Sequence, residues 1–126
     1  MFESYDKYAK YNNYRDSNYN SNIDYSNAIE YLKTKVDLPN YIQGTTSHEV
    51  KQVSTSEFRT CSFLHDGSSM MSVSINNNSG QWLWYSFSDD VGGSIVDFYA
   101  LYYYGNTDKE NIKLAIKELA KEFDLL

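Results

Sequence analysis

The 126-residue sequence has one cysteine, one proline and no long apolar run. A single cysteine excludes a disulfide within the chain and is typical of a protein from a reducing compartment. No stretch approaches the ~20 apolar residues that a transmembrane helix needs. The first residues also lack the apolar centre of a secretory signal. These absences predict a soluble cytoplasmic protein.

Positive charge is scarce as well. The chain has 11 Lys and Arg against 17 Asp and Glu, which gives a net charge of −6 at pH 7. Between Gln43 and Asp108 the only cations are Lys51 and Arg59. Because non-specific affinity for nucleic acid comes mainly from cations on phosphates, the chain as a whole is not a general polyanion binder. The acidic balance fits a basic protein partner, or a nucleic-acid site that is small and local.

Aromatic residues, by contrast, are abundant, and 13 of the residues are tyrosine. Near the N-terminus Tyr5, Tyr8, Tyr11 and Tyr14 recur every three residues among polar side chains. Tyrosines in such a segment could clamp a partner or stack on bases. A polar tail is the simpler interpretation, since aliphatic residues are almost absent. We therefore expect residues 1–22 to form a flexible polar tail and residues 23–126 to form one domain.

The first helix is predicted from about Asn27 to Val36. Ile29 and Leu32 fall on one face of it together with Val36, and Pro39 limits it. Asn27 and Glu30 have the spacing of an N-cap residue and its reciprocal partner. The helix faces the core, and we attach no function to it.

Two further helices are predicted at the C-terminal end. Ser94 is placed as an N-cap with Asp97 three residues on, and Gly105 is a typical stop for that helix. Thr107 with Glu110 predicts a second capping box ahead of the last helix. The last helix has an apolar face and a lysine face.

Strand patterns occupy the middle of the chain. One or two short strands are expected within residues 49–59, and residues 71–75 alternate as a strand with one buried face. Residues 76–80 are a strong turn signal, and the aromatic run Gln81–Phe87 returns from it as a central strand. The predicted fold is α+β, with a small antiparallel sheet, an N-terminal helix and two C-terminal helices.

Five short pieces follow one another in a fixed order. They are Cys61-Ser62-Phe63-Leu64-His65, Ser68-Ser69-Met70-Met71-Ser72-Val73, Trp84-Tyr85-Ser86-Phe87-Ser88-Asp89, Gly92-Gly93-Ser94-Ile95-Val96-Asp97-Phe98 and Ala115-Ile116-Lys117-Glu118-Leu119-Ala120. In order and spacing the chain from about Ile23 onward resembles the zinc-binding domain of bacterial and phage DNA primases. That domain has a Cys-Pro-x-His loop, an aromatic strand that leads into Cys-Phe-x-Cys, and a Gly-Gly before an Ile-x-Phe helix.

The resemblance implies four zinc-ligand positions, and this chain departs from the pattern at them. The second ligand pair is replaced by Ser86 and Asp89, and an extra residue separates Cys61 from His65. One interpretation keeps a metal on Cys61, His65 and Asp89. The favoured interpretation is a vestigial site that has lost its zinc, because a serine hydroxyl is a poor zinc ligand. Aromatic side chains of the strand would then replace the metal by packing.

In the family this domain grips single-stranded template and works with a separate polymerising domain. No carboxylate cluster for nucleotidyl transfer, phosphate-binding glycine loop or nucleophile–base pair is visible here, so we expect a protein that is not an enzyme. The resemblance implies a non-catalytic accessory protein for DNA replication or priming in a phage or mobile element. It would bind a polymerase, primase or helicase, with single-stranded DNA as a second ligand, and the candidate contact residues are Lys51, Arg59, Trp82, Trp84, Tyr85 and Phe87. Core packing is the competing interpretation for at least one of the tryptophans.

Two alternatives of other classes stay open. An acidic inhibitor or anti-defence protein could reuse the scaffold to occupy a nucleic-acid-binding surface of a host protein, and Asp89 and Asp90 fit that interpretation. A purely structural interaction module would have no affinity for DNA.

Overall fold

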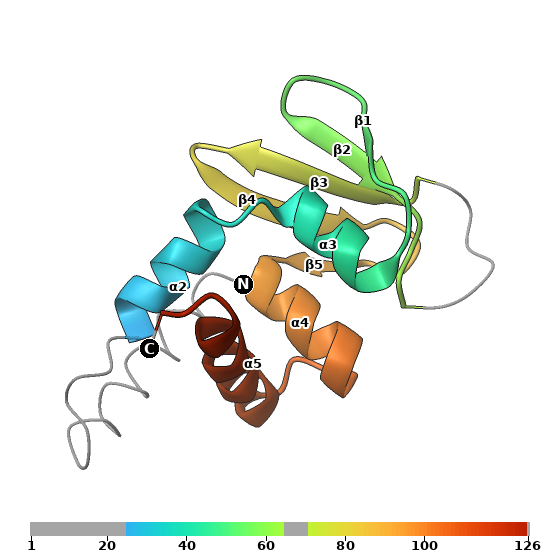
Figure 1. Ribbon diagram of the computed structural model, residues 1–126. Coiled ribbons are helices and arrows are strands. Elements are labelled where there is room, and N and C mark those ends of the chain that lie inside the picture. The colour runs from blue at the N-terminus through green and yellow to red at the C-terminus, as the bar shows by residue number, and fades with distance from the viewer. Residues whose placement is uncertain (1–24, 65–70, 126) are drawn as a thin grey trace, which may run out of the picture.

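A computed structural model describes residues 25–64 and 71–125. The tyrosine-rich segment of residues 1–22 and His65 lie outside the described residues. The described helices and strands (Figure 1) are α2 (Tyr25–Thr34), α3 (Leu38–Thr46), β1 (Lys51–Gln52), β2 (Glu57–Thr60), β3 (Val73–Asn78), β4 (Gln81–Ser86), β5 (Val91–Gly93), α4 (Ile95–Tyr104) and α5 (Lys109–Glu122).

The five strands form one antiparallel sheet in the order of the sequence, from β1 to β5. The predicted α+β class with a small antiparallel sheet is therefore confirmed. β4 lies between β3 and β5, as expected of a central strand. The turn between β3 and β4 consists of Ser79 and Gly80, whose φ angles of 56° and 81° suit a tight hairpin. The sequence did not predict β5, which is only three residues long.

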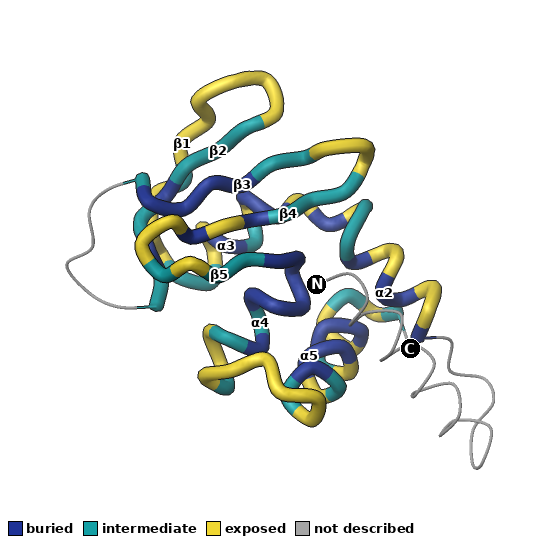
Figure 2. Tube along the Cα trace, turned by 180° about the vertical axis from the view of Figure 1, so that it is seen from behind, coloured by how far each residue is buried: buried dark blue, intermediate teal, exposed yellow. Residues whose placement is uncertain are grey.

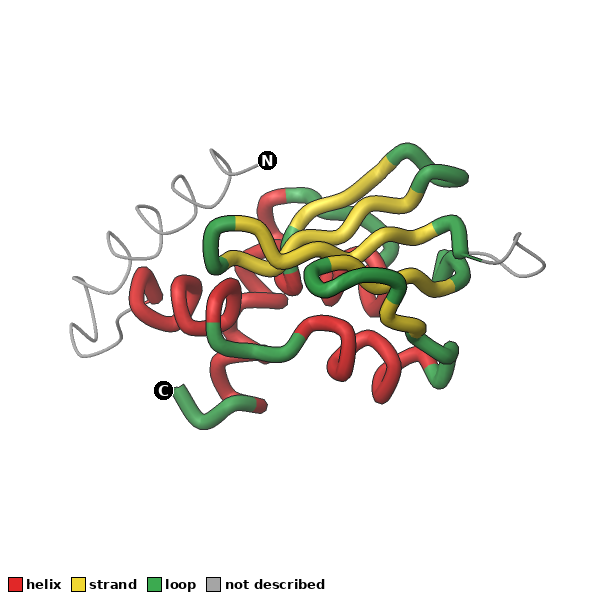
Figure 3. The backbone as a smooth tube through the Cα atoms, turned by 90° about the horizontal axis from the view of Figure 1, so that it is seen from above, coloured by secondary structure: helices red, strands yellow, loops and turns green. Residues whose placement is uncertain are grey.

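Alternation along β3 and β4 divides the sheet into two unlike faces. Val73, Ile75 and Trp84 point to the same face, are at most 2% exposed, and belong to one core with the helices. The view in Figure 3 shows the strands side by side as one layer with the helices outside it. In Figure 2 the buried stretches lie where α2 and α4 approach the sheet and where α5 packs beside these two helices. The described helices therefore cover one face, and none of them covers the opposite face.

Residues 25–46 hold two helices where the sequence predicted one. α2 begins at Tyr25, so Asn27 lies inside it and is not its N-cap. Pro39 does not merely limit a helix, because it sits in the first turn of α3. In the first turn of a helix a backbone N–H has no intrahelical acceptor, so a proline, which lacks this N–H, costs the helix no hydrogen bond. The Asp37 side chain caps α3 by accepting a hydrogen bond from the backbone N–H of Asn40 at 3.2 Å.

The predicted start and end of α4 are confirmed. The Ser94 hydroxyl accepts from the Val96 N–H at 3.2 Å, and the Ser94 N–H donates to Asp97 Oδ2 at 3.0 Å. Gly105 ends the helix with a φ of 89°, and its N–H donates to the Leu101 carbonyl at 3.1 Å. This capping box fixes the direction in which the chain leaves β5.

The predicted capping box of α5 is wrong. Asp108, not Thr107, is the N-cap residue, and its side chain makes no cap hydrogen bond. Glu110 instead lies 3.3 Å from the Lys113 ammonium, one turn further on. The apolar face of α5 packs into the core as expected, through Ile112, Ala115, Ile116, Leu119 and Ala120. Among the described residues no helix combines the length and apolarity needed to cross a membrane.

Candidate binding face of the sheet

The uncovered face of the sheet carries one row of side chains that crosses all five strands. The strand register pairs Lys51 with Arg59, Arg59 with Ser74, Ser74 with Tyr85, and Tyr85 with Gly92. Partners in neighbouring strands share a face, so these five residues lie on the same side. Two cations thus stand at one end of the row, and an aromatic ring and a glycine stand at the other.

Two aromatic rings are exposed on this face. Tyr85 is 38% exposed and Phe87 is 60% exposed, and their ring centroids are 5.0 Å apart in an edge-to-face arrangement. The Phe87 N–H donates to the Ser72 carbonyl at 2.8 Å, which continues the pairing of β3 and β4 past the end of the strand. The guanidinium carbon of Arg59 lies 5.3 Å from the centre of the Phe87 ring. Planar groups on this face can therefore meet an aromatic surface with a cation beside it.

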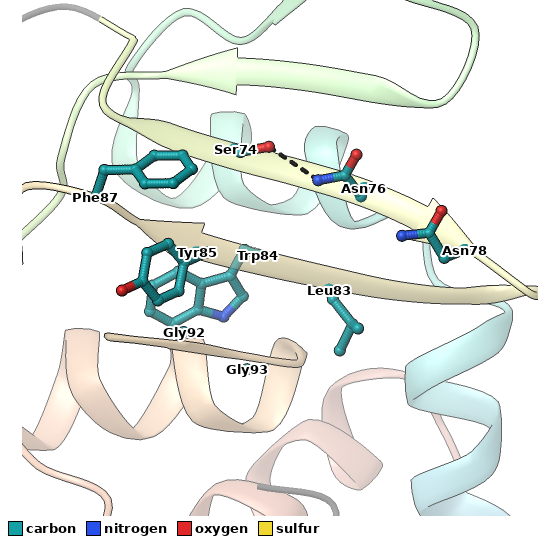
Figure 4. A pocket seen from close by; sticks show the side chains of 9 residues that line it. All are labelled: Ser74, Asn76, Asn78, Leu83, Trp84, Tyr85, Phe87, Gly92 and Gly93. Atoms are coloured by element: carbon teal, nitrogen blue, oxygen red, sulfur yellow. Dashed lines mark hydrogen bonds between the residues drawn. The ribbon is translucent and has the colours of Figure 1, made fainter. Parts of the chain in front are cut away.

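A groove of about 540 Å³ runs along the same face between β3 and β5. Figure 4 shows Ser74, Asn76 and Asn78 along one side of it, from β3, and Leu83 and Tyr85 along the other, from β4. Gly92 and Gly93 of β5 also line the groove, and they place no side chain in it. A Cβ on Gly92 would stand 2.9 Å from Tyr85 Cδ1 and would clash with the Trp84 carbonyl oxygen (Trp84 also lines the groove). The groove thus combines an aromatic end with a polar side.

Hydrogen bonds fix the polar side of the groove. The Ser74 hydroxyl donates to Glu57 Oε2 at 2.7 Å, and the Asn76 amide nitrogen donates to the Ser74 oxygen at 2.8 Å. With its nitrogen engaged in this way, Asn76 presents its amide oxygen as an acceptor. Asn78 is exposed at the end of the strand. Neutral hydrogen-bonding groups of this kind suit the edges of nucleic-acid bases or the amides of a peptide.

The charges of this face are largely compensated. Arg59 Nε lies 2.8 Å from Glu57 Oε2, and Arg59 also donates to the Met71 carbonyl at 2.8 Å. The hydrogen bond from Ser74, and then the contact with Arg59, hold the pKa of Glu57 below its usual range. The Tyr85 hydroxyl donates to Asp90, and this bond, with some desolvation, raises the pKa of Tyr85. Lys51 is exposed at the edge of the sheet. Such a face attracts phosphates weakly, so stacking would have to contribute most of any affinity for nucleic acid.

The two tryptophans of the candidate set lie on the covered side. Trp84 is 2% exposed, and its indole N–H donates to the Ser94 carbonyl at 2.8 Å. Trp82 is half-buried, and its ring centroid lies 5.8 Å from that of Phe58. A buried indole cannot stack on a base, so Trp84 is a core residue here. The candidate residues that the fold brings together are Lys51, Arg59, Tyr85 and Phe87.

Two of the positions where the resemblance places zinc ligands, Ser86 and Asp89, form a hydrogen-bonded cluster with Ser62. The Ser86 hydroxyl donates to Asp89 Oδ2 at 2.6 Å, and the Ser62 hydroxyl donates to the same oxygen at 2.7 Å. Ser62 and Ser86 are each 1% exposed. Cys61 is half-buried, and His65 lies outside the described residues.

This donor set does not fit a structural zinc site. Such a site needs four nitrogen or sulfur ligands in a tetrahedron, whereas the cluster offers hydroxyl and carboxylate oxygens that are bonded to one another. Within residues 25–64 and 71–125 no group of three or more His, Cys, Asp or Glu side chains could hold a metal ion. The cluster instead ties the loop after β2 to the turn after β4.

Sequence reasoning missed the polar side of the groove. Ser74, Asn76 and Asn78 alternate with Val73 and Ile75, so the alternation that identified the buried face also contained these residues. It could not show that the helices would leave the opposite face open.

Comparison with protein-family models, curated proteins and solved structures gives no match for this chain. The primase resemblance is therefore a hypothesis that the sequence motifs alone carry.

Proposed function

We propose that this protein is a non-catalytic accessory protein for DNA replication or priming in a phage or mobile element. It holds a short segment of single-stranded DNA on the open face of its sheet and acts in the cytoplasm beside a polymerase, primase or helicase. The primase-like order of motifs supports the replication context. The observation that carries the DNA-binding part is the exposed pair Tyr85 and Phe87, with Arg59 beside the Phe87 ring.

The chemistry of the face suits bases better than phosphates. Tyr85 and Phe87 each offer an exposed ring for stacking, which tolerates any base sequence. The groove beside them supplies the amide groups of Asn76 and Asn78 for hydrogen bonds to base edges. Among the described residues of this face only Lys51 and Arg59 can meet phosphates, and Glu57 already compensates Arg59. A segment of a few nucleotides, weakly held, is what such a site can bind.

Fluorescence anisotropy with a labelled oligothymidylate tests this proposal. We expect Tyr85→Ala and Phe87→Ala each to weaken binding by roughly 5- to 150-fold, the range that follows from base–aromatic stacking. Tyr103→Ala is the matched control, because Tyr103 is also an exposed tyrosine but lies on α4. Its affinity should stay within about twofold of the parent.

The salt dependence provides a second measurement. With at most two phosphate contacts, the slope of log K against log salt should be no steeper than about −1.4 for a single strand. A slope several times steeper would mean that DNA binds elsewhere on the chain. Equal losses in the Tyr85 and Tyr103 variants, or no binding at low salt, would contradict the proposal.

A second candidate function is that of an acidic inhibitor that occupies a nucleic-acid-binding surface of a host protein. The net charge of −6 favours it. This alternative predicts no affinity for the oligothymidylate and competition with DNA for the host protein, so the same anisotropy assay separates the two functions.

A further inference from the structure

A second surface, on the helices, gathers tyrosine rings. It consists of Tyr41 from α3 and Tyr99, Tyr103 and Tyr104 from α4, and we call it the tyrosine surface. The ring centroids of Tyr99 and Tyr103 are 4.5 Å apart, and those of Tyr99 and Tyr104 are 5.9 Å apart. Tyr103 is 52% exposed. The i and i+4 spacing of Tyr99 and Tyr103 places both rings on one side of α4.

Two carboxylates of α5 border these rings. The Tyr41 hydroxyl donates to Glu122 Oε1 at 3.1 Å. Burial, and then the charge and hydrogen bond of Glu122, raise the pKa of Tyr41 well above its usual range. Burial, with Tyr104 and Glu118 next in effect, raises the pKa of Tyr99 to about 12. The tyrosine surface is therefore both aromatic and electrically negative.

A groove of about 360 Å³ adjoins this surface at Tyr41, where α2, α3 and the end of α5 meet. Val36 and Phe123 contribute apolar walls, and Tyr31, which is 42% exposed, stands at its edge. Asp37 and Lys35 also line it. The ring centroids of Tyr41 and Phe123, which both line the groove, are 5.7 Å apart. Because Tyr41 also belongs to the tyrosine surface, the groove and that surface share this residue.

We propose that the tyrosine surface and the adjoining groove dock a basic segment of a partner protein. Arginine or lysine side chains of that segment lie on the tyrosine rings beside Glu118 and Glu122, and an apolar side chain enters the groove. Cations are attracted to the faces of aromatic rings. The net charge of −6 draws a basic partner to the protein.

The proposed dock is separate from the DNA-binding face. It shares no residue with the groove on the sheet. One molecule can therefore hold single-stranded DNA and a basic partner at the same time. The dock does not depend on the proposed DNA affinity, so either can fail alone.

Isothermal titration calorimetry with two synthetic peptides tests the dock. One peptide is helical with leucine and arginine on separate faces, and the other has glutamate at every arginine position. We expect the full chain to bind the arginine peptide and not the glutamate peptide. Glu118→Gln combined with Glu122→Gln should weaken binding by about tenfold, as the loss of two charge pairs at the surface implies.

Glu49→Gln combined with Glu110→Gln is the matched control, because this double variant changes the net charge by as much as Glu118→Gln combined with Glu122→Gln. Glu49 is exposed ahead of β1, and Glu110 lies at the opposite end of α5 from Glu122, ~18 Å away along the helix. This control should bind the arginine peptide within twofold of the parent. Tyr103→Ala, checked for folding by circular dichroism, should weaken binding several-fold through the lost ring.

Equal weakening in the two glutamine pairs would overturn the proposal, because the attraction would then be a general effect of charge. Equal binding of both peptides would overturn it too. A dimer in solution that Glu118→Gln and Glu122→Gln disrupt would assign the surface to a second copy instead. Binding of the oligothymidylate should be unchanged in both glutamine pairs, which keeps failure of the dock distinguishable from failure of the DNA site.

Discussion

Replacing Asp89 by alanine should destabilise the fold far more than the same change at its neighbour Asp90. One carboxylate oxygen of Asp89 accepts hydrogen bonds from Ser62 at 2.7 Å and from Ser86 at 2.6 Å. Both serines are 1% exposed, so water cannot readily take the place of the carboxylate. Asp90 is exposed and accepts a hydrogen bond from the Tyr85 hydroxyl at the surface.

The magnitude follows from the two hydrogen bonds. A hydrogen bond to a charged group contributes roughly 1.5–3 kcal/mol, and a buried donor left without a partner costs about as much. Partial relaxation around Ser62 and Ser86 reduces the sum. We expect Asp89→Ala to lower the free energy of unfolding by about 2–4 kcal/mol, and Asp90→Ala by less than about 1 kcal/mol.

Urea unfolding followed by tryptophan fluorescence measures the difference. Trp84 reports on this region because its ring centroid lies 5.1 Å from that of Phe63, the residue after Ser62. With a slope of about 2 kcal/mol per molar urea, the Asp89 variant should lose about 1–2 M in its midpoint. In a double-mutant cycle, Asp89→Ala and Ser86→Ala should couple by about 1–2 kcal/mol.

Equal midpoints for Asp89→Ala and Asp90→Ala would refute this reasoning, since the cluster would then contribute nothing measurable. A zinc titration of the parent protein tests the alternative interpretation, in which Asp89 binds a metal. If zinc raised the free energy of unfolding of the parent by several kcal/mol and not that of Asp89→Ala, Asp89 would be a metal ligand and the vestigial-site hypothesis would be wrong.

Two further predictions concern glycine positions and alkaline stability. Gly92→Ala should destabilise the fold by more than about 2 kcal/mol, because the new Cβ meets the backbone of Trp84. In Gly44→Ala, within α3, the new Cβ meets nothing within 4 Å, and the variant should be more stable by about 0.5–1 kcal/mol. Urea midpoints of both variants check this, and a tolerated Gly92→Ala would contradict the close approach of β4 and β5. Burial is the main cause that raises the pKa of Tyr99 to about 12, so the folded state favours the neutral form of this tyrosine. The contribution of neutral Tyr99 to the free energy of unfolding is therefore complete below pH ~10 and is lost as the pH rises toward 12. Tyr99→Phe should flatten that loss in urea midpoints taken at increasing pH, and an unchanged pH profile would show that Tyr99 is not responsible.

The sequence was sufficient where a signal is local. The alternation of Val73 and Ile75 predicted a strand with one buried face. Ser94 and Asp97 predicted the start of α4, because a capping box depends only on residues three apart. The aromatic run predicted a central strand, and β4 is one. The candidate contacts came with the primase resemblance and comprised Trp82 and the buried Trp84 as well as Lys51, Arg59, Tyr85 and Phe87.

Local signals failed where two interpretations compete for the same residues. A proline such as Pro39 is typical both of the end of one helix and of the first turn of the next. In the structure Asp37 caps α3, so Pro39 lies in the first turn of that helix. Thr107 and Glu110 have the spacing of a capping box, but Asp108 occupies the N-cap position. Element boundaries of this kind depend on where the neighbouring turns place the chain.

By itself, then, the sequence determined the α+β class, the two faces of β3 and β4 and the acidic balance of the chain. Only the tertiary structure decided which face of the sheet the helices cover, because that depends on contacts between residues far apart in the chain. That choice buried Trp84 and exposed Tyr85, although the two are neighbours in one strand. It also brought Ser62, Ser86 and Asp89 together, and it joined Tyr41 to Glu122 across 81 residues of sequence.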